Sequence, residues 1–204
     1  RIYRKIGAGE YCCVGTTTKT SFTDEVKKAG SYVYQVKALN GSKEIAASPE
    51  KAVSVKTMLL KKGKTYTVGG YKYKVLKSTK KTKTVAFAGV TNKKLTKILI
   101  PDSVKIHGLT YKVTEISAKA LNGNKKVKTV SIGANVTKIG KQAFYKAGKL
   151  ANIVVKTKKL KSVGSKALSG ISKKAEIRVP SSKYTKYKKI FKGKGQKSSV
   201  KIKK

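Results

Sequence analysis

Residues that could act as acids, bases, nucleophiles or metal ligands are few in this chain of 204 residues. The chain has one histidine, His107, together with two adjacent cysteines and eight carboxylates. Asp102 and Glu115 are the carboxylates nearest to His107 in the sequence, and no nucleophile pattern surrounds it. We therefore interpret His107 as a surface-loop residue rather than a general base or a metal ligand. This inventory predicts a protein that is not an enzyme and that needs no metal or cofactor.

The two cysteines, Cys12 and Cys13, lie in a segment with strand-like sequence, where neighbouring side chains point to opposite faces. They are not expected to bridge each other, and the spacing typical of a metal site is absent, so we interpret both as small strand residues. No apolar run approaches the ~20 residues that span a bilayer, which predicts no transmembrane segment. The first residues do not form a signal peptide, and we expect one upstream of Arg1.

Lysine is the residue type with the clearest functional content. The chain has 50 lysines and arginines against 8 aspartates and glutamates, and all but three of the basic residues are lysines. Residues 1–57 hold 10 basic and 5 acidic side chains, whereas residues 58–204 hold 40 and 3. The second part therefore carries nearly all of the formal net charge of +42.

An excess of this size indicates an acidic partner, because lysines bind phosphate groups without reading sequence. Teichoic acid, a sulfated glycan and nucleic acid are candidates. Nucleic acid is the least favoured of the three because arginine, which reads guanine edges, is rare here. A lysine coat that is merely solvated is the alternative interpretation. The candidate polyanion-binding residues are Lys158, Lys159, Lys161, Lys183, Lys186, Lys188 and Lys189.

The second part repeats itself. Short strands with alternating apolar residues recur, with Ile98/Ile100, Val130/Ile132, Ile153/Val155 and Ile177/Val179 predicted to point inward. A second apolar pattern follows the strands. Its equivalent positions are Ile116, Ile139 and Val163, which are spaced by 23 and 24 residues. Such a period indicates a solenoid, in which each coil buries its apolar edge against the next.

The repeat resembles the BspA-like bacterial leucine-rich repeats. Ile132-Gly133, Val136, Ile139-Gly140, Ala143-Phe144 and Leu150 match that pattern position by position. Asn124, Ala147 and Ile171 stand where the family often has cysteine, so no cysteine ladder is expected. About nine extra residues around His107-Gly108 predict a hairpin-like excursion from the first clear coil.

The exposed positions of the repeat strands are expected to form a ladder, because solenoid sheets commonly bind partners on such a surface. Its mixed, partly apolar character favours a protein partner. The candidate protein-binding residues are Lys97, Leu99, Thr129, Ser131, Asn152, Val154 and Arg178, with Glu176 beside them.

Both ends of a solenoid need a cap. After Pro180, the residues Tyr184, Tyr187 and Phe191 fall on one face of a predicted short helix that Gly193 ends, and a strand follows at residues 199–203. At the other end, residues 65–68, 71–75 and 84–87 predict a small antiparallel unit that turns at Gly69-Gly70.

Residues 1–57 have the rhythm of a β-sandwich, with strands predicted at residues 1–5, 11–17, 21–24, 32–40 and 52–56. Their order resembles the back half of a fibronectin type III module, which needs about seven strands. Two N-terminal strands are missing from that resemblance, so exposed apolar surface and an unpaired edge are expected.

The predicted protein is mainly β: a partial fibronectin type III-like sandwich (1–57), a hairpin cap or linker (58–92), leucine-rich repeats with a strand and a turn or short helix per coil (93–180), and a cap with a helix (181–204). The resemblance implies a non-catalytic binding or adhesion module at the C-terminus of a secreted or surface-attached bacterial protein. Its expected partners are an extracellular protein or an anionic wall or glycan polymer. A targeting or spacer appendage of a larger extracellular hydrolase and a nucleic-acid-binding protein are the alternatives.

Overall fold

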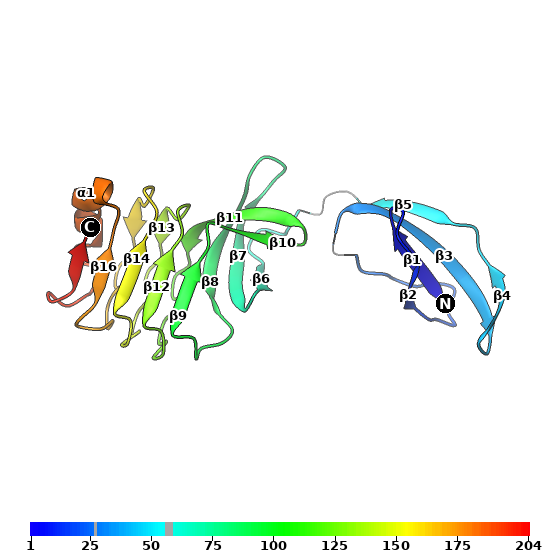
Figure 1. Ribbon diagram of the computed structural model, residues 1–204, viewed down its shortest axis with the longest axis horizontal. Coiled ribbons are helices and arrows are strands. Elements are labelled where there is room, and N and C mark those ends of the chain that lie inside the picture. The colour runs from blue at the N-terminus through cyan, green and yellow to red at the C-terminus, as the bar shows by residue number, and fades with distance from the viewer. Residues whose placement is uncertain (27, 56–58) are drawn as a thin grey trace. The chain divides into compact units, whose positions relative to one another are not determined.

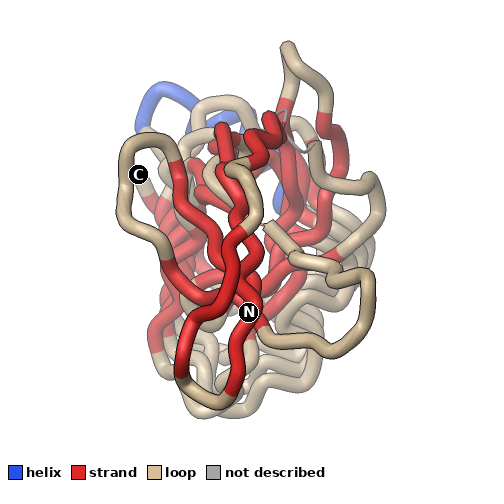
Figure 2. The backbone as a smooth tube through the Cα atoms, turned by 90° about the vertical axis from the view of Figure 1, so that its right-hand side faces the viewer, coloured by secondary structure: helices blue, strands red, loops and turns tan. Residues whose placement is uncertain are grey.

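The computed structural model describes residues 1–26, 28–55 and 59–204. The chain divides into two compact units, Arg1–Leu59 and Leu60–Lys204. Figure 1 labels their elements, and Figure 2 shows that strands and loops make up most of the described chain. No helix in the described part of the chain is long and apolar enough to cross a membrane.

The first unit is a single five-stranded sheet. Its strands are β1 (Ile2–Ile6), β2 (Cys12–Gly15), β3 (Gly30–Asn40), β4 (Lys43–Ala47) and β5 (Lys51–Val55), in the order β2-β1-β3-β4, and β5 also pairs with β3. The last residue of the strand predicted at 52–56 lies outside the described residues.

The strand predicted at residues 21–24 is wrong. These residues have no strand partner, and the segment is held instead by polar side chains of the sheet. A carboxylate oxygen of Asp24 accepts hydrogen bonds from Arg4 at 2.6 Å and from the hydroxyl of Tyr34 at 2.7 Å. The strand β4 is not among the predicted strands, and all five of its residues are exposed.

Part of the first unit's sheet carries exposed apolar side chains. Register places Ile2 opposite Val36 and Ile6 opposite Tyr32, so these residues share one face. Ile2 and Tyr32 are buried, whereas Ile6 and Val36 are 55 % and 51 % exposed. Val53, opposite Tyr32 on β5, is also exposed.

The second unit begins with an antiparallel meander. The strands β6 (Thr65–Val68), β7 (Tyr71–Ser78) and β8 (Lys83–Val90) pair in sequence, and the first turn lies at Gly69-Gly70, where both residues have positive φ. The strands β10 (Ser103–Ile106) and β11 (Leu109–Ile116) form the expected hairpin, with His107-Gly108 as its turn.

Two parallel sheets build the solenoid that follows. The front sheet consists of β9 (Lys97–Ile100), β12 (Thr129–Ile132), β14 (Asn152–Val155), β16 (Glu176–Arg178) and β17 (Lys201–Lys203). The back sheet continues from β8 through β11, β13 (Lys138–Ile139) and β15 (Ser162–Val163). The predicted solenoid is confirmed, and its coils also carry two-residue strands, β13 and β15, where the sequence indicated turns or short helices.

A stack of turns forms the third side of the solenoid. Backbone amides of one coil donate to carbonyls of the next, as from Leu121 to Ala143 at 2.7 Å and from Phe144 to Ala167 at 3.0 Å. Each coil is therefore hydrogen-bonded to its neighbour on three sides.

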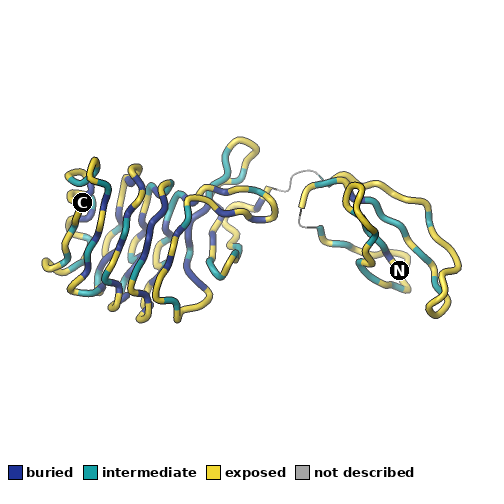
Figure 3. The backbone as a smooth tube through the Cα atoms, in the orientation of Figure 1, coloured by how far each residue is buried: buried dark blue, intermediate teal, exposed yellow. Residues whose placement is uncertain are grey.

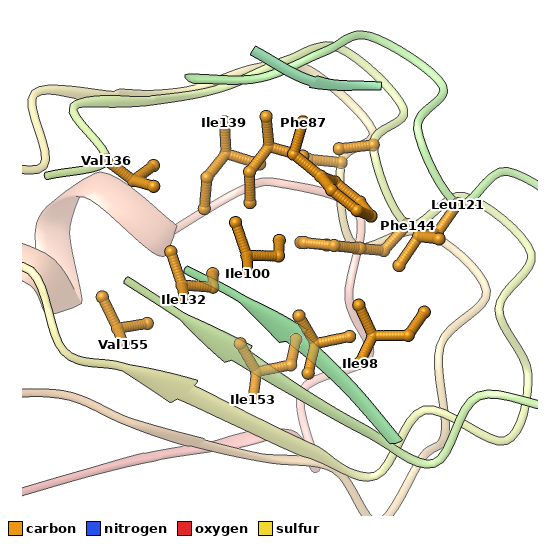
Figure 4. Close-up of a cluster of buried hydrophobic side chains, with 14 of the residues drawn as sticks. Phe87, Ile98, Ile100, Leu121, Ile132, Val136, Ile139, Phe144, Ile153 and Val155 are labelled. Carbon is orange, nitrogen blue, oxygen red and sulfur yellow. The ribbon is translucent and has the colours of Figure 1, made fainter. Parts of the chain in front are cut away.

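The core of the second unit lies between the two sheets and the turn stack. Ile98, Ile100, Val130 and Ile132 point inward from the front sheet and are fully buried, as predicted. Phe144 approaches them from the turn stack (Figure 4). Figure 3 shows the buried positions recurring from coil to coil. Each such aliphatic side chain contributes about 1.5–3 kcal/mol by leaving water, so coils support each other rather than folding alone.

A capping helix follows the last front-sheet strand of the repeats, as predicted. A 3-10 turn (Ser181–Lys183) leads into α1 (Tyr184–Phe191), which buries Tyr187 and Phe191. Gly193, with φ of 70°, follows the helix, and β17 then pairs in parallel with β16.

Candidate functional site

The outer face of the front sheet aligns the predicted ladder into two rows. One row runs through Lys97, Thr129, Asn152 and Glu176, and the second runs through Leu99, Ser131, Val154 and Arg178. The strand β17 extends these rows by Lys201 and Lys203. All seven candidate protein-binding residues thus lie on the same face of the front sheet.

This surface is shallow and chemically mixed. Leu99 is 52 % exposed, whereas Ser131, in the adjacent strand, is only 8 % exposed. The backbone amide of Leu99 donates to the hydroxyl of Tyr71 at 3.2 Å, which satisfies one group of the outermost strand. The face therefore presents an exposed apolar side chain beside a nearly covered polar one.

Charges at the far end of the front sheet compensate each other. Glu176 lies between Lys203, whose Nζ donates to it, and Arg178, whose guanidinium is 3.2 Å away. The hydrogen bond from Lys203 is the main reason that the pKa of Glu176 falls below its ordinary value, and the nearby positive charges add to it. Arg178 is thus oriented within the surface by an ion pair.

The seven candidate polyanion-binding lysines are only partly brought together. Lys183, Lys186 and Lys189 line a hollow of about 480 Å³ at the capping helix. Lys188 is exposed on the same helix but does not line that hollow, whereas Lys158, Lys159 and Lys161 belong to the segment between β14 and β15.

Two further hollows of the second unit are also lined by lysines. Lys81, Lys83 and Lys112 surround one of about 260 Å³, and another of about 250 Å³ is lined by Lys72, Lys93 and Lys119. These lysines are not among the seven candidate polyanion-binding residues. No spacing could have found them, because they come from strands and turns far apart in the chain.

All three carboxylates of the second unit are engaged within it. Asp102 accepts a hydrogen bond from the backbone amide of Ala134, and a carboxylate oxygen of Glu115 lies 3.9 Å from Nζ of Lys138. Glu176 is paired as described above. The second unit therefore has no free carboxylate side chain left to neutralise the other charges among the 40 basic side chains of residues 58–204.

The other chemically notable residues lie apart from these surfaces. His107 is exposed at the β10–β11 turn, and its ring meets that of Tyr66 edge-on, with centroids 5.3 Å apart. Cys12 and Cys13 are free and exposed in β2. Among the residues that the structure describes, no three His, Cys, Asp or Glu side chains form a group that could hold a metal ion.

Stacked coils of 23 to 24 residues, each with a front-sheet strand and an inward Ala-Phe or Ala-Leu pair, define a leucine-rich-repeat solenoid. Residues 80–204 match the BspA type leucine rich repeat region, in six copies. The match covers more than half of the chain, which therefore belongs to the BspA-type leucine-rich-repeat family. Comparison with curated proteins returns no match.

The chain is similar to solved structures of bacterial leucine-rich repeat proteins, one of which shares the fold with a TM-score above 0.5. A leucine-rich repeat protein from Bacteroides capillosus is 20 % identical with a TM-score of 0.53, and the alignment covers 69 % of this chain and 99 % of that one. A leucine rich cell surface protein from Faecalibacterium prausnitzii is 22 % identical with a TM-score of 0.46, covering 58 % of this chain and 37 % of that one. A leucine-rich repeat protein from Bacteroides ovatus is 26 % identical with a TM-score of 0.43, and the alignment covers 56 % of this chain and 35 % of that one. This chain thus spans about a third of the length of the last two proteins.

Proposed function

We propose that this chain is a non-catalytic binding module of a secreted or surface-attached bacterial protein, and that it docks an extracellular protein on the outer face of the front sheet. The observation that carries the proposal is the pair of aligned rows on that face, which places Leu99 and Val154 on one accessible surface with polar and charged neighbours. Membership of the BspA-type family supports a binding role.

The docking face has the composition of a protein interface rather than of a phosphate site. An exposed leucine can serve as an apolar anchor, with the nearly covered Ser131 beside it. Asn152 and the paired Arg178 supply polar contacts at the edge of the surface.

The test is binding of the purified chain to a panel of purified extracellular-matrix proteins. The double variant Leu99→Glu/Val154→Glu places two charges on the docking face, and we expect at least tenfold weaker binding, about 1.4 kcal/mol or more. The matched control is Thr110→Glu/Ser162→Glu, which adds the same charge at two exposed positions of the back sheet, one in β11 and one in β15. Equal loss in both variants, or no binding by the unaltered chain, would reject the proposal.

A second candidate function is retention of the protein on an anionic wall or glycan polymer. The excess of 40 basic over 3 acidic side chains in residues 58–204 favours it, since the three carboxylates are already engaged. Binding to purified cell wall, with and without its teichoic acid, should fall steeply between about 50 and 500 mM salt. Binding that changes neither with salt nor with removal of the polymer would exclude this candidate.

For the first unit we propose a fibronectin type III-like domain. The order β2-β1-β3-β4 and the apolar face around Tyr32 support it, because a sandwich needs a second layer over that face. A structure of the full-length protein in which further strands cover Ile6, Val36 and Val53 would support this assignment. A face left bare there would reject it.

Two other functions make different predictions about the whole protein. A hydrolase domain upstream of Arg1 would favour a targeting or spacer role, whereas a signal peptide and further repeats would favour the binding module. Duplex DNA binding with a measurable sequence preference would favour a nucleic-acid-binding protein, although the surface is poor in arginine.

A further inference from the structure

One corner of the solenoid carries a lysine at the same position in four successive coils. Lys94, Lys126, Lys149 and Lys173 each stand three residues ahead of the first residue of a front-sheet strand. We name these four the corner lysines. They occupy the junction between the turn stack and the front sheet, and none of them belongs to the ladder or to the lysines of the cap.

Hydrogen bonds between coils fix the alignment of this corner. The amide of Thr129 donates to the carbonyl of Thr96 at 3.1 Å, and that of Asn152 donates to Lys128 at 3.0 Å. The amide of Glu176 donates to the carbonyl of Ala151 in the preceding coil at 2.8 Å. Neighbouring strands lie about 4.8 Å apart, so the four corner lysines follow a line of about 14 Å along the solenoid.

Side chains of the turns hold the backbone at this corner. Oδ1 of Asn92 accepts from the amide of Lys94, and Oδ1 of Asn124 accepts from the amide of Lys126, both at 2.9 Å. In the fourth coil, Oγ of Ser172 accepts from the amide of Lys174, the residue after Lys173, at 3.2 Å. These bonds hold the backbone at Lys94, at Lys126 and next to Lys173, while all four corner lysines have exposed side chains.

The corner is positive over its whole length. Four more lysines flank the corner lysines, and all eight side chains are exposed. In the described part of the chain, none of the eight forms an ion pair with a carboxylate. The flanking residues are Lys93, Lys125, Lys174 and Lys197.

We propose that the corner lysines bind one linear, flexible polyanion that runs along the solenoid axis, with its phosphate or sulfate groups against successive coils. This inference rests on the second candidate function and names its site. Aligned ammonium groups repel each other unless anions lie between them. A polymer with repeating tetrahedral oxyanions supplies one anion for each coil or for every second coil. Lysine suits such a ligand because its point charge needs no bidentate geometry.

A stiff duplex fits this corner less well than a flexible chain. The phosphates of B-DNA follow a helical path. One DNA strand can therefore lie along the straight row of about 14 Å over only a short length. A flexible polymer can instead adjust its spacing to the coils. We therefore assign a wall phosphodiester polymer or a sulfated glycan as the ligand class.

The experiment compares two variants of the full chain that lose the same charge. The first replaces the four corner lysines by Gln, and the control replaces Lys64, Lys74, Lys77 and Lys105, four exposed lysines away from the corner. Binding to poly(glycerol phosphate), to heparin and to duplex DNA is measured across a salt series, and thermal unfolding confirms that both variants are folded.

For the corner variant, the slope of log K against log salt should become shallower by about 3, because each of the four lost contacts removes ~0.7 from it. For the control, the slope should change by less than 1. At 0.15 M salt this corresponds to about hundredfold weaker binding for the corner variant. A response to poly(glycerol phosphate) alone or to heparin alone identifies the source of the oxyanions. Affinity for oligomers of increasing length should rise until they span the row of about 14 Å.

Three outcomes would overturn the proposal. Equal losses in the two variants would mean diffuse attraction, which rejects the corner site while leaving retention by charge intact. Tighter binding of duplex DNA than of both flexible polymers would reject the ligand class. No binding of any polyanion by the unaltered chain would reject the second candidate function together with its site.

Discussion

The hydroxyl of Tyr187, on the capping helix, accepts a hydrogen bond from the backbone amide of Leu160 at 2.9 Å. The same hydroxyl donates to the carbonyl of Thr157 at 2.9 Å. A single side chain thus satisfies two backbone groups of the segment that leads into β15, where another coil would otherwise supply the partners. The helix therefore closes the back sheet by a specific contact as well as by covering it.

Replacing Tyr187 by Phe should lower the free energy of unfolding of the second unit by about 1–3 kcal/mol, because a buried amide and a carbonyl lose their partner. Urea unfolding followed by circular dichroism measures the change. The control is Tyr184→Phe, a half-buried tyrosine on the same helix, for which we expect less than about 0.5 kcal/mol. Equal effects would show that the hydroxyl is not what closes the sheet.

Replacing Gly164 by Ala should destabilise the solenoid by about 3 kcal/mol or more, since an added Cβ would overlap the backbone of Lys141 in the preceding coil. Thermal unfolding provides the measurement. Gly148→Ala is the control, because the nearest atom to its Cβ would be 3.9 Å away, at ordinary contact distance. The prediction fails if both variants unfold at the same temperature.

Replacing Lys146 by Gly should stabilise the protein by about 1 kcal/mol. Lys146 has φ of 56°, a conformation costly for a residue with a Cβ, and glycines occupy the equivalent places at Gly123 and Gly170. Lys141→Gly, at ordinary φ in the same stack, should instead cost about 0.5–1 kcal/mol. Chemical denaturation of both variants tests the sign, and a loss of stability in Lys146→Gly would contradict it.

Stability should fall in alkali in a way that depends on Tyr73. Burial raises the pKa of Tyr73 to about 12, above the ordinary value of 10.0. Its contribution is therefore complete below pH 10 and is lost as pH rises through about 12. The difference in unfolding free energy between the unaltered chain and Tyr73→Phe should shrink over this window. A difference that is constant from pH 9 to 12 would show that Tyr73 has an ordinary pKa.

The repeat coils could be predicted from the sequence because two signals agreed. The alternation in Ile98/Ile100 and Val130/Ile132 marked the front-sheet strands, and the period of 23 to 24 residues set their register. That register also placed the rows of the ladder, so the outer face of the front sheet followed from counting residues.

Other elements had no signal of their own. The strand β13 has two residues, and it exists because its neighbours in the back sheet offer it hydrogen-bond partners. The strand β4 is wholly exposed, so no apolar alternation marked it. Residues 21–24 fit the rhythm of short strands, but the polar contacts of Asp24 hold them against the sheet without strand pairing.

The candidate sites divide along the same line. Positions on one strand row follow from register, whereas the hollow of Lys72, Lys93 and Lys119 depends on where turns and strands meet in three dimensions. The corner lysines are an intermediate case. Their spacing from each strand is visible in the sequence, but the hydrogen bonds that align them are visible only in the structure.

The hydrogen bonds between coils all run along the solenoid axis, and this direction governs how the second unit would respond to force. Tension between its ends loads the bonds of the outermost coil first, so they break in succession as in a zipper rather than together in shear. Each released coil of 23 to 24 residues would add about 80 Å of extended chain. A module of this design would yield gradually under tension, lengthening while its remaining coils stay folded.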